Sequence, residues 1–189
     1  MTRRSAHQAR HRPPSSEPSG PRPPAEAARA RWSLLAGVGA AVLAVDQLTK
    51  WWAVESLDGG RTIDLVGSLR LRLAINYGSA FSLAQGRGAL ISLLALVIVA
   101  VLVRSGRYAT RPWSAAAIGL VVGGALGNLV DRAFRDGDGF LGGGVVDFID
   151  LQWWPVFNVA DSAIVVGAIL LFLLEARDER DDGRRDAAT

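Results

Sequence analysis

Two aspartates in apolar surroundings are the residues of this sequence best suited to chemistry. The runs VVDFID (145–150) and FNVAD (157–161) place Asp147 and Asp161 among hydrophobic neighbours. Two carboxyl groups in a site of low dielectric constant share one proton, so the ionised group can accept a proton from water while the protonated group polarises a carbonyl. If the fold brings the pair together, it can hydrolyse an amide by general acid–base catalysis without a covalent intermediate.

The segment around Asp161 also has a structural interpretation. Asn158 and Asp161 have the spacing of an N-cap residue and an acidic residue in the first turn of a helix, where both residue types are favoured. The helix dipole favours the ionised form of Asp161, so we expect Asp161 to begin as the base and Asp147 to carry the proton. Coupled carboxyls titrate together, so this assignment describes the pair rather than either residue alone.

Asp46 and Lys50 interrupt another apolar segment within the run DQLTK (46–50). Their i, i+4 spacing, with the acid first, suits a helical ion pair that holds the end of the helix in the bundle. A functional alternative makes Lys50 the base that activates a serine nucleophile. Ionisable residues inside apolar segments are costly and mark candidate functional sites, so the sequence leaves both interpretations open.

A further polar cluster follows a stripe of glycines. Gly119, Gly123 and Gly127 recur at every fourth position, a spacing that lets helices approach closely. Directly after them come three polar residues that share one helix face, namely Asn128, Asp131 and Arg132. Asp131 and Arg132 could simply anchor the end of the helix at the membrane interface, and we expect Asp131 to serve stability more than chemistry.

Composition excludes several other kinds of chemistry. The chain has no cysteine, and its two histidines, His7 and His11, lie in a Pro/Ser-rich N-terminal segment. Disulfides, thiol nucleophiles, Ser-His-Asp triads and histidine-ligated zinc sites are therefore excluded. The net charge of +3 comes from arginines before residue 32 and not from a basic face with aromatics, which nucleic acid binding requires. We expect no metal, no cofactor and no nucleic acid partner.

Four apolar segments must position the polar residues. They cover residues 33–54, 88–103, 112–130 and 158–176, and their lengths are close to the roughly 20 residues that cross a bilayer as a helix. Four spans place both chain ends on the same side of the membrane. Arginines in both tails and in the link 104–111 mark that side as cytoplasmic.

This pattern predicts three parts. Residues 1–31 should form a disordered cytoplasmic tail, because they contain too few apolar residues to form a core. Residues 32–176 should form the membrane domain, and residues 177–189 a charged cytoplasmic tail. The two remaining connections, roughly residues 55–87 and 131–157, are long and face outward.

The first outward connection, residues 55–87, contains a predicted strand. In SLRLRLAIN (68–76), apolar residues alternate with polar or small ones, which is the period of a half-buried strand, and its expected partner lies around residues 62–66. An open sheet edge cannot be satisfied in lipid, so this hairpin must lie outside the hydrocarbon. Asn76 ends the predicted strand, where Asn and Gly are also common simply as turn residues.

Together these motifs resemble bacterial lipoprotein signal peptidase, also called signal peptidase II. The resemblance covers roughly residues 33–175, and its motifs occur in the order found in that family. The matching runs are DQLTK (46–50), NYGSAF (76–81), GGALGNLVDR (123–132), VVDFID (145–150) and WPVFNVADSAI (154–164).

The resemblance implies an all-α integral membrane protein, a bundle of four transmembrane helices with a small extracytoplasmic β element between the first two. It implies an aspartyl endopeptidase of the bacterial inner membrane that removes signal peptides from prolipoproteins whose lipobox cysteine carries diacylglycerol. The active site would lie at the outer face of the membrane. Membrane lipids and globomycin-like inhibitors are further partners that the resemblance implies.

The same resemblance assigns roles to individual residues. It makes Asp147 and Asp161 the catalytic pair, and it gives Asp46 and Lys50 a structural role. Positions that line the substrate site of the family correspond to Asn76, Asn128, Arg132 and Asn158.

Three other functions fit some of these features. A membrane transporter or a structural scaffold could also use paired intramembrane acids, although a transporter would place them near the middle of the membrane. A metal-dependent hydrolase could use oxygens of Asp147, Asp161 and Asn158 as ligands.

Overall fold

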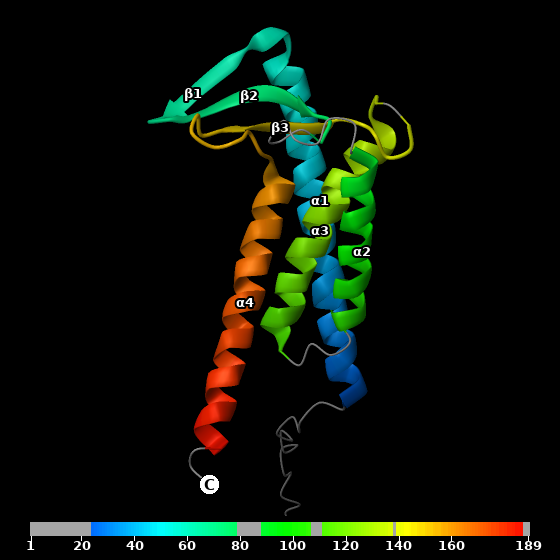
Figure 1. Ribbon diagram of the computed structural model, residues 1–189, viewed down its shortest axis with the longest axis vertical. Coiled ribbons are helices and arrows are strands. Elements are labelled where there is room, and N and C mark those ends of the chain that lie inside the picture. The colour runs from blue at the N-terminus through cyan, green and yellow to red at the C-terminus, as the bar shows by residue number, and fades with distance from the viewer. Residues whose placement is uncertain (1–23, 79–87, 107–110, 138, 187–189) are drawn as a thin grey trace, which may run out of the picture.

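A computed structural model describes residues 24–78, 88–106, 111–137 and 139–186 of the chain. This part of the chain contains four long helices and a three-stranded antiparallel sheet (Figure 1). In chain order the elements are α1 (Pro24–Leu57), the short 3₁₀ helix η1 (Asp58–Gly60), β1 (Thr62–Val66), β2 (Leu69–Asn76), α2 (Gly88–Gly106), α3 (Pro112–Phe134), β3 (Val145–Asp150) and α4 (Val159–Asp186).

The four helices of the described chain are long and apolar enough to cross a membrane, as the sequence predicted. Their large apolar side chains point outward: Leu94 of α2 and Phe172 of α4, for example, are 59% and 71% exposed. α3 packs against α1, α2 and α4, and buries mainly small residues such as Ala115 and Ala117. Small residues inside and large apolar residues outside are the arrangement expected of helices surrounded by lipid.

The glycine stripe of α3 provides the contact with α1, which confirms its predicted packing role. A Cβ atom at Gly119 would lie 2.7 Å from the backbone oxygen of Leu35, and one at Gly123 would lie 2.5 Å from that of Gly39. At Gly127 the obstacle is a side chain, because a Cβ atom there would lie 2.5 Å from Oδ2 of Asp46. The stripe therefore brings the polar residues of α1 and α3 to within hydrogen-bonding reach.

The sheet covers one end of the helix bundle, and the start of α1 and the end of α4 lie toward the other end (Figure 1). The strands lie in the order β1-β2-β3. Apolar residues join the sheet to the end of α1, since Ala53 and Leu57 pack with Val146 and Phe148 in one buried cluster. This cluster fixes the height of β3 above the helices.

The third strand was not predicted. The sequence analysis placed residues 145–150 in a connection, because VVDFID lacks the alternation of a half-buried strand. In the structure, all but one of its residues are buried, so apolar side chains are required on both faces. Its register sets Asp147 opposite Ala74 and Val145 opposite Asn76.

Two helices extend beyond the apolar segments. α1 includes residues 24–31 and α4 continues to Asp186, into stretches that the sequence analysis assigned to the tails. The extension of α1 is rich in Ala and Arg, which have high helix propensity, whereas that of α4 consists mainly of Arg and Asp. The rest of the predicted N-terminal tail, residues 1–23, lies outside the described residues.

Candidate active site

Asp147 and Asp161 are brought together through Asn158, which confirms that the fold juxtaposes the two motifs. Asp147 lies on β3 and Asp161 in the first turn of α4. The Asn158 side chain donates a hydrogen bond from Nδ2 to Oδ1 of Asp147 at 2.7 Å, and its backbone N–H donates to Oδ2 of Asp161 at 3.2 Å. One residue therefore links the two carboxyl groups.

Asn158 and Asp161 also cap α4. The backbone N–H of Asp161 donates to Oδ1 of Asn158 at 2.9 Å, reciprocating the bond from the Asn158 backbone to the Asp161 carboxylate. This is the geometry of a capping box, in which the side chains at both ends of the first turn satisfy backbone donors that lack partners in the helix. The structural interpretation is thus correct, and the cap itself fixes the rotamer of Asp161.

Two more asparagines hold the remaining carboxylate oxygens. Asn128 of α3 donates from Nδ2 to Oδ1 of Asp161 at 2.8 Å, and Asn76 of β2 donates from Nδ2 to Oδ2 of Asp147 at 3.1 Å. Asn128 and Asn158 also contact each other, with Nδ2 of Asn158 at 3.0 Å from Oδ1 of Asn128. Each oxygen of both aspartates therefore accepts at least one hydrogen bond from a fixed donor.

Burial raises the pKa of the Asp147 carboxyl from 3.8 to about 7, and the nearby carboxylate of Asp161 acts in the same direction. Hydrogen bonds from Asn76 and Asn158 and the charge of Lys50 lower the pKa but do not outweigh these effects. A carboxyl with a pKa near 7 can give and take a proton at neutral pH.

A cavity of about 330 Å³ opens beside the two aspartates. Its polar end is formed by Asp147, Asp161 and the asparagines Asn76 and Asn128. Its remaining wall is largely apolar and is formed by α2, α3 and α4, with Ile91, Ala95, Ile98, Val121, Ala125, Leu129 and Ile164 among the lining residues. The cavity can therefore take an apolar segment and present one polar group of it to the carboxyls.

Arg132 lies in the last turn of α3 and lines the same cavity. Its side chain is 7% exposed, and Nη1 donates to the backbone oxygen of Gly143 at 3.5 Å. Its charge interacts with both Asp147 and Asp161. A buried guanidinium in this position can hold a peptide carbonyl or stabilise negative charge that develops on it.

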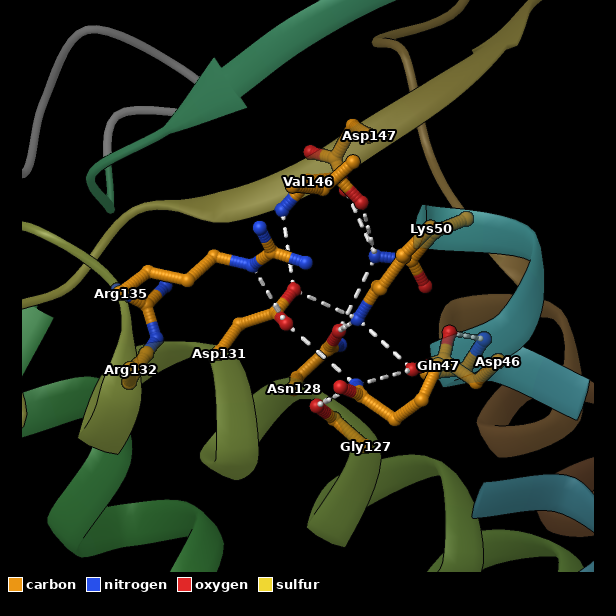
Figure 2. A network of polar contacts seen from close by, with 12 residues as sticks. Asp46, Gln47, Lys50, Gly127, Asn128, Asp131, Arg132, Arg135, Val146 and Asp147 are labelled. Atoms are coloured by element: carbon orange, nitrogen blue, oxygen red, sulfur yellow. Dashed lines mark hydrogen bonds and ion pairs between the residues drawn. The ribbon is translucent and has the colours of Figure 1, made fainter. Parts of the chain in front are cut away.

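Lys50 lies at the centre of a second polar cluster, which Figure 2 shows from close by. Its ammonium group contacts Oδ2 of Asp46 at 2.8 Å, Oδ2 of Asp131 at 3.0 Å and Oδ1 of Asn128 at 2.8 Å. The predicted pair with Asp46 is therefore present, and Asp131 is a second carboxylate that the sequence analysis did not connect to it. All three N–H bonds of the ammonium are used, so Lys50 is not available as a base for a serine.

Comparison with known proteins decides between the remaining functions. The family model described as signal peptidase (SPase) II matches residues 38–177. The chain belongs to the signal peptidase II family. Membership makes it a protease, and the four apolar helices make it a multi-pass membrane protein, so the transporter and scaffold alternatives are set aside.

Relatives from other bacteria are similar in sequence over most of this chain. The lipoprotein signal peptidase of Rhodococcus jostii (strain RHA1) is 49% identical over 170 residues, covering 89% of this chain and 85% of the relative. That of Mycobacterium avium (strain 104) is 45% identical over 159 residues, covering 84% and 87%. A bacterial membrane enzyme solved by the in meso method at 2.3 Å resolution matches with a TM-score of 0.66 and 27% identity, covering 76% of this chain and 88% of that one.

Asp150, the other acid of VVDFID, lies outside the site. Its Oδ2 accepts hydrogen bonds from Nε of Arg70 at 2.8 Å and of Arg72 at 2.6 Å, and its Oδ1 accepts one from the backbone of Gln152 at 2.7 Å. Burial alone would raise the pKa of Asp150, but the bonds from Arg72, Gln152 and Arg70 outweigh it and lower the pKa to about 2. Asp150 therefore remains ionised and stabilises the sheet.

Sequence analysis missed two members of the polar cluster. Gln47 donates from Nε2 to Oδ2 of Asp46 at 3.2 Å and to the backbone oxygen of Gly127 at 3.0 Å. Arg135 pairs through Nε with Oδ1 of Asp131 at 2.9 Å. Gln47 is a polar residue inside an apolar segment, a signal that could have identified it, whereas Arg135 resembles any arginine that follows a membrane helix.

The described residues contain no group of three or more His, Cys, Asp or Glu side chains arranged to hold a metal ion. Asn158 turns its amide nitrogen toward Asp147, and its oxygen accepts the N–H of Asp161. The oxygen of Asn158 is therefore already engaged, which disfavours the arrangement of ligands considered for a metal-dependent hydrolase.

Proposed function

We propose that this protein is an aspartyl endopeptidase that removes signal peptides from diacylglyceryl-modified prolipoproteins. The relatives named lipoprotein signal peptidase support the substrate class. The observation that carries the catalytic type is the linkage of Asp147 and Asp161 through Asn158 at the polar end of an apolar cavity. Cleavage occurs at the peptide bond before the lipidated lipobox cysteine.

The first step is the addition of water to the carbonyl before the cysteine. Ionised Asp161 accepts a proton from the water molecule while the oxygen of that water attacks the carbonyl carbon. Asp147 gives its proton to the carbonyl oxygen. Both carboxyls are held by asparagine donors, so the pair does not reorganise during the step. The product is a tetrahedral diol that is not bonded to the enzyme.

In the second step the carbon–nitrogen bond breaks. Asp161 returns a proton to the leaving nitrogen, and Asp147 takes one from a hydroxyl of the diol as the carbonyl forms again. The products are a signal peptide with a new carboxyl end and a lipoprotein with a free amino group on its diacylglyceryl cysteine. Both aspartates then have their starting protonation.

The cavity and the membrane place the substrate. Apolar side chains of the signal peptide lie against α2, α3 and α4, the acyl chains of the diacylglycerol remain among membrane lipids, and Arg132 holds the peptide near the cleavage point. Globomycin-like inhibitors act by filling the same cavity.

Residues 1–31 and 177–189 lie on the cytoplasmic side, and the sheet and active site lie at the outer face of the inner membrane, as the arginine distribution indicates.

The test is a cleavage assay with purified protein in detergent. A synthetic diacylglyceryl-prolipoprotein should give two products whose masses place the cut before the lipidated cysteine, and a chelator should leave the rate unchanged. Absence of cleavage by folded protein would refute the proposed activity, and loss of activity with chelator would refute the metal-free mechanism.

A further inference from the structure

The buried cluster around Lys50 holds the backbone directly before each proposed catalytic aspartate. The backbone N–H of Val146, which precedes Asp147, donates to Oδ2 of Asp131 at 3.1 Å. The backbone N–H of Ala160, which precedes Asp161, donates to Oδ1 of Asp46 at 2.9 Å. Two carboxylates from different helices thus make the same contact at corresponding positions of two motifs.

Both backbone groups need such an acceptor. Ala160 lies in the first turn of α4, where backbone N–H groups have no acceptor within the helix. Val146 is fully buried on β3, so an N–H without a partner there would be costly. Asp46 and Asp131 therefore supply acceptors and fix where β3 and α4 begin relative to α1 and α3.

Lys50 joins the two acceptors into one unit. Its ammonium contacts Oδ2 of both Asp46 and Asp131, and Figure 2 shows it between them. Gln47 bridges the same two carboxylates from the other side, with Nε2 at 3.2 Å from Asp46 Oδ2 and 3.4 Å from Asp131 Oδ1. Arg135 pairs with Asp131, so two cations balance two anions in this cluster.

We propose that Asp46, Lys50 and Asp131 are positioning residues that set the separation of the two catalytic aspartates. Asp46 holds the backbone N–H of Ala160 and Asp131 holds that of Val146. Lys50 binds both carboxylates and so fixes the two contacts relative to each other. The inference rests on the proposed function for the roles of the two catalytic aspartates. Asp46 and Lys50 are 0% exposed and Asp131 is 1% exposed, so these side chains cannot touch a substrate. They act on the rate by setting geometry, where a displacement of about 1 Å can cost about 100-fold, and Lys50 acts in addition through its charge, which lowers the pKa of Asp147.

A kinetic test separates positioning from ordinary stabilisation. Asp131→Ala and Asp46→Ala remove an acceptor and should lower kcat about 10- to 100-fold per folded molecule, with KM for the diacylglyceryl-prolipoprotein changed less than about threefold. Asp131→Asn keeps an oxygen for the Val146 N–H and should recover most of the lost kcat. The control is Asp150→Ala, which removes a buried, ion-paired carboxylate from β3, the strand that carries Asp147. This variant should lower stability without lowering kcat.

An exchange measurement tests the same proposal without turnover, first in the wild-type protein and then in a variant. In ¹⁵N-labelled wild-type protein, the amide protons of Val146 and Ala160 should exchange with solvent as slowly as those of the middle of α3, because both are bonded to buried carboxylates. Where Asp131→Ala folds, exchange at Val146 should accelerate about tenfold or more and exchange at Ala160 should accelerate less.

The outcomes are distinct. Wild-type kcat in folded Asp131→Ala and Asp46→Ala, or fast exchange of both amides in the wild type, would overturn the positioning role. Slow exchange in a wild-type protein that does not cleave the prolipoprotein would instead overturn the proposed function and leave the structural linkage intact.

Discussion

Replacing Asp147 by asparagine is expected to stabilise the protein at high pH while removing its activity. The pKa of Asp147 is raised from 3.8 to about 7, so between these values the folded protein keeps a proton that the unfolded chain has lost. The folded state then binds more protons, and its stability falls as the pH rises through this range. An asparagine cannot ionise, so the variant does not lose this stability.

The magnitude follows from the same two pKa values. A tenfold change in an acid constant corresponds to about 1.4 kcal/mol, so the raised pKa of Asp147 costs about 4 kcal/mol once the pH is above 7. The new amide also places an N–H₂ group against one of the donors that now contact the carboxyl, Asn76 or Asn158, at a cost of about 1–3 kcal/mol. That cost does not depend on pH, so the variant should gain roughly 2–3 kcal/mol relative to wild type between about pH 5 and about pH 8.

The assay is thermal unfolding of purified wild-type protein and variant in detergent at both pH values. Asp150→Asn is the matched control, because Asp150 lies on the same strand and is equally buried but has a lowered pKa of about 2. The stability that Asp150 supplies is present above the ordinary pKa of an aspartate and is lost only as the pH falls toward 2. Asp150→Asn should therefore lower Tm by a similar amount at both pH values.

The reasoning about Asp147 is refuted if the Tm difference between Asp147→Asn and wild type is the same at both pH values. It is also refuted if the difference becomes less favourable to the variant as the pH rises. Either result would mean that Asp147 is ionised like an ordinary carboxylate in the folded protein.

Three further predictions follow from the geometry. Arg132→Ala should lower kcat/KM about 10- to 100-fold without abolishing cleavage, since a lost hydrogen bond from a charged group costs about 1.5–3 kcal/mol, and complete loss in folded protein would assign Arg132 a larger role. Gly127→Ala should lower both Tm and kcat, because its Cβ would lie 2.5 Å from Oδ2 of Asp46, and unchanged kcat would show that α1 and α3 separate without consequence. Accessibility reporters in 56–66 and 136–143 should both lie on the outer side of the inner membrane, and a cytoplasmic signal from either would contradict the proposed location of the active site.

The helices could be read from the sequence because each is a long apolar segment bounded by charged residues. The predicted third span began at the same residue, Pro112, as α3 does. Strand β2 was found from its alternation, whereas β3 was missed, because it is buried on both faces and has no alternation to detect. The sequence also did not show that α1 extends to Pro24, since helix propensity outside a bilayer is a weak signal.

The chemistry of the site was predictable in part. Asp147 and Asp161 stood out because carboxylates are costly in apolar runs. The three-way contact of Lys50 could not be predicted, since Asp131 lies far along the chain and only the rotation of α3 against α1 brings it near. The dual role of Asn158, which caps α4 and bridges the aspartates, also depends on the position of β3.

The central claim, that Asp147 and Asp161 act as one catalytic unit, is tested most directly by cleavage of a diacylglyceryl-prolipoprotein with single and double asparagine variants. Asp147→Asn and Asp161→Asn should each abolish cleavage in folded protein, and the double variant should lose nothing more, because residues that act as a unit are not additive. Asp136→Asn, an exposed acid outside the site, should cleave at the wild-type rate. Cleavage at the wild-type rate by folded Asp147→Asn or Asp161→Asn, or a further large loss in the double variant, would contradict the account.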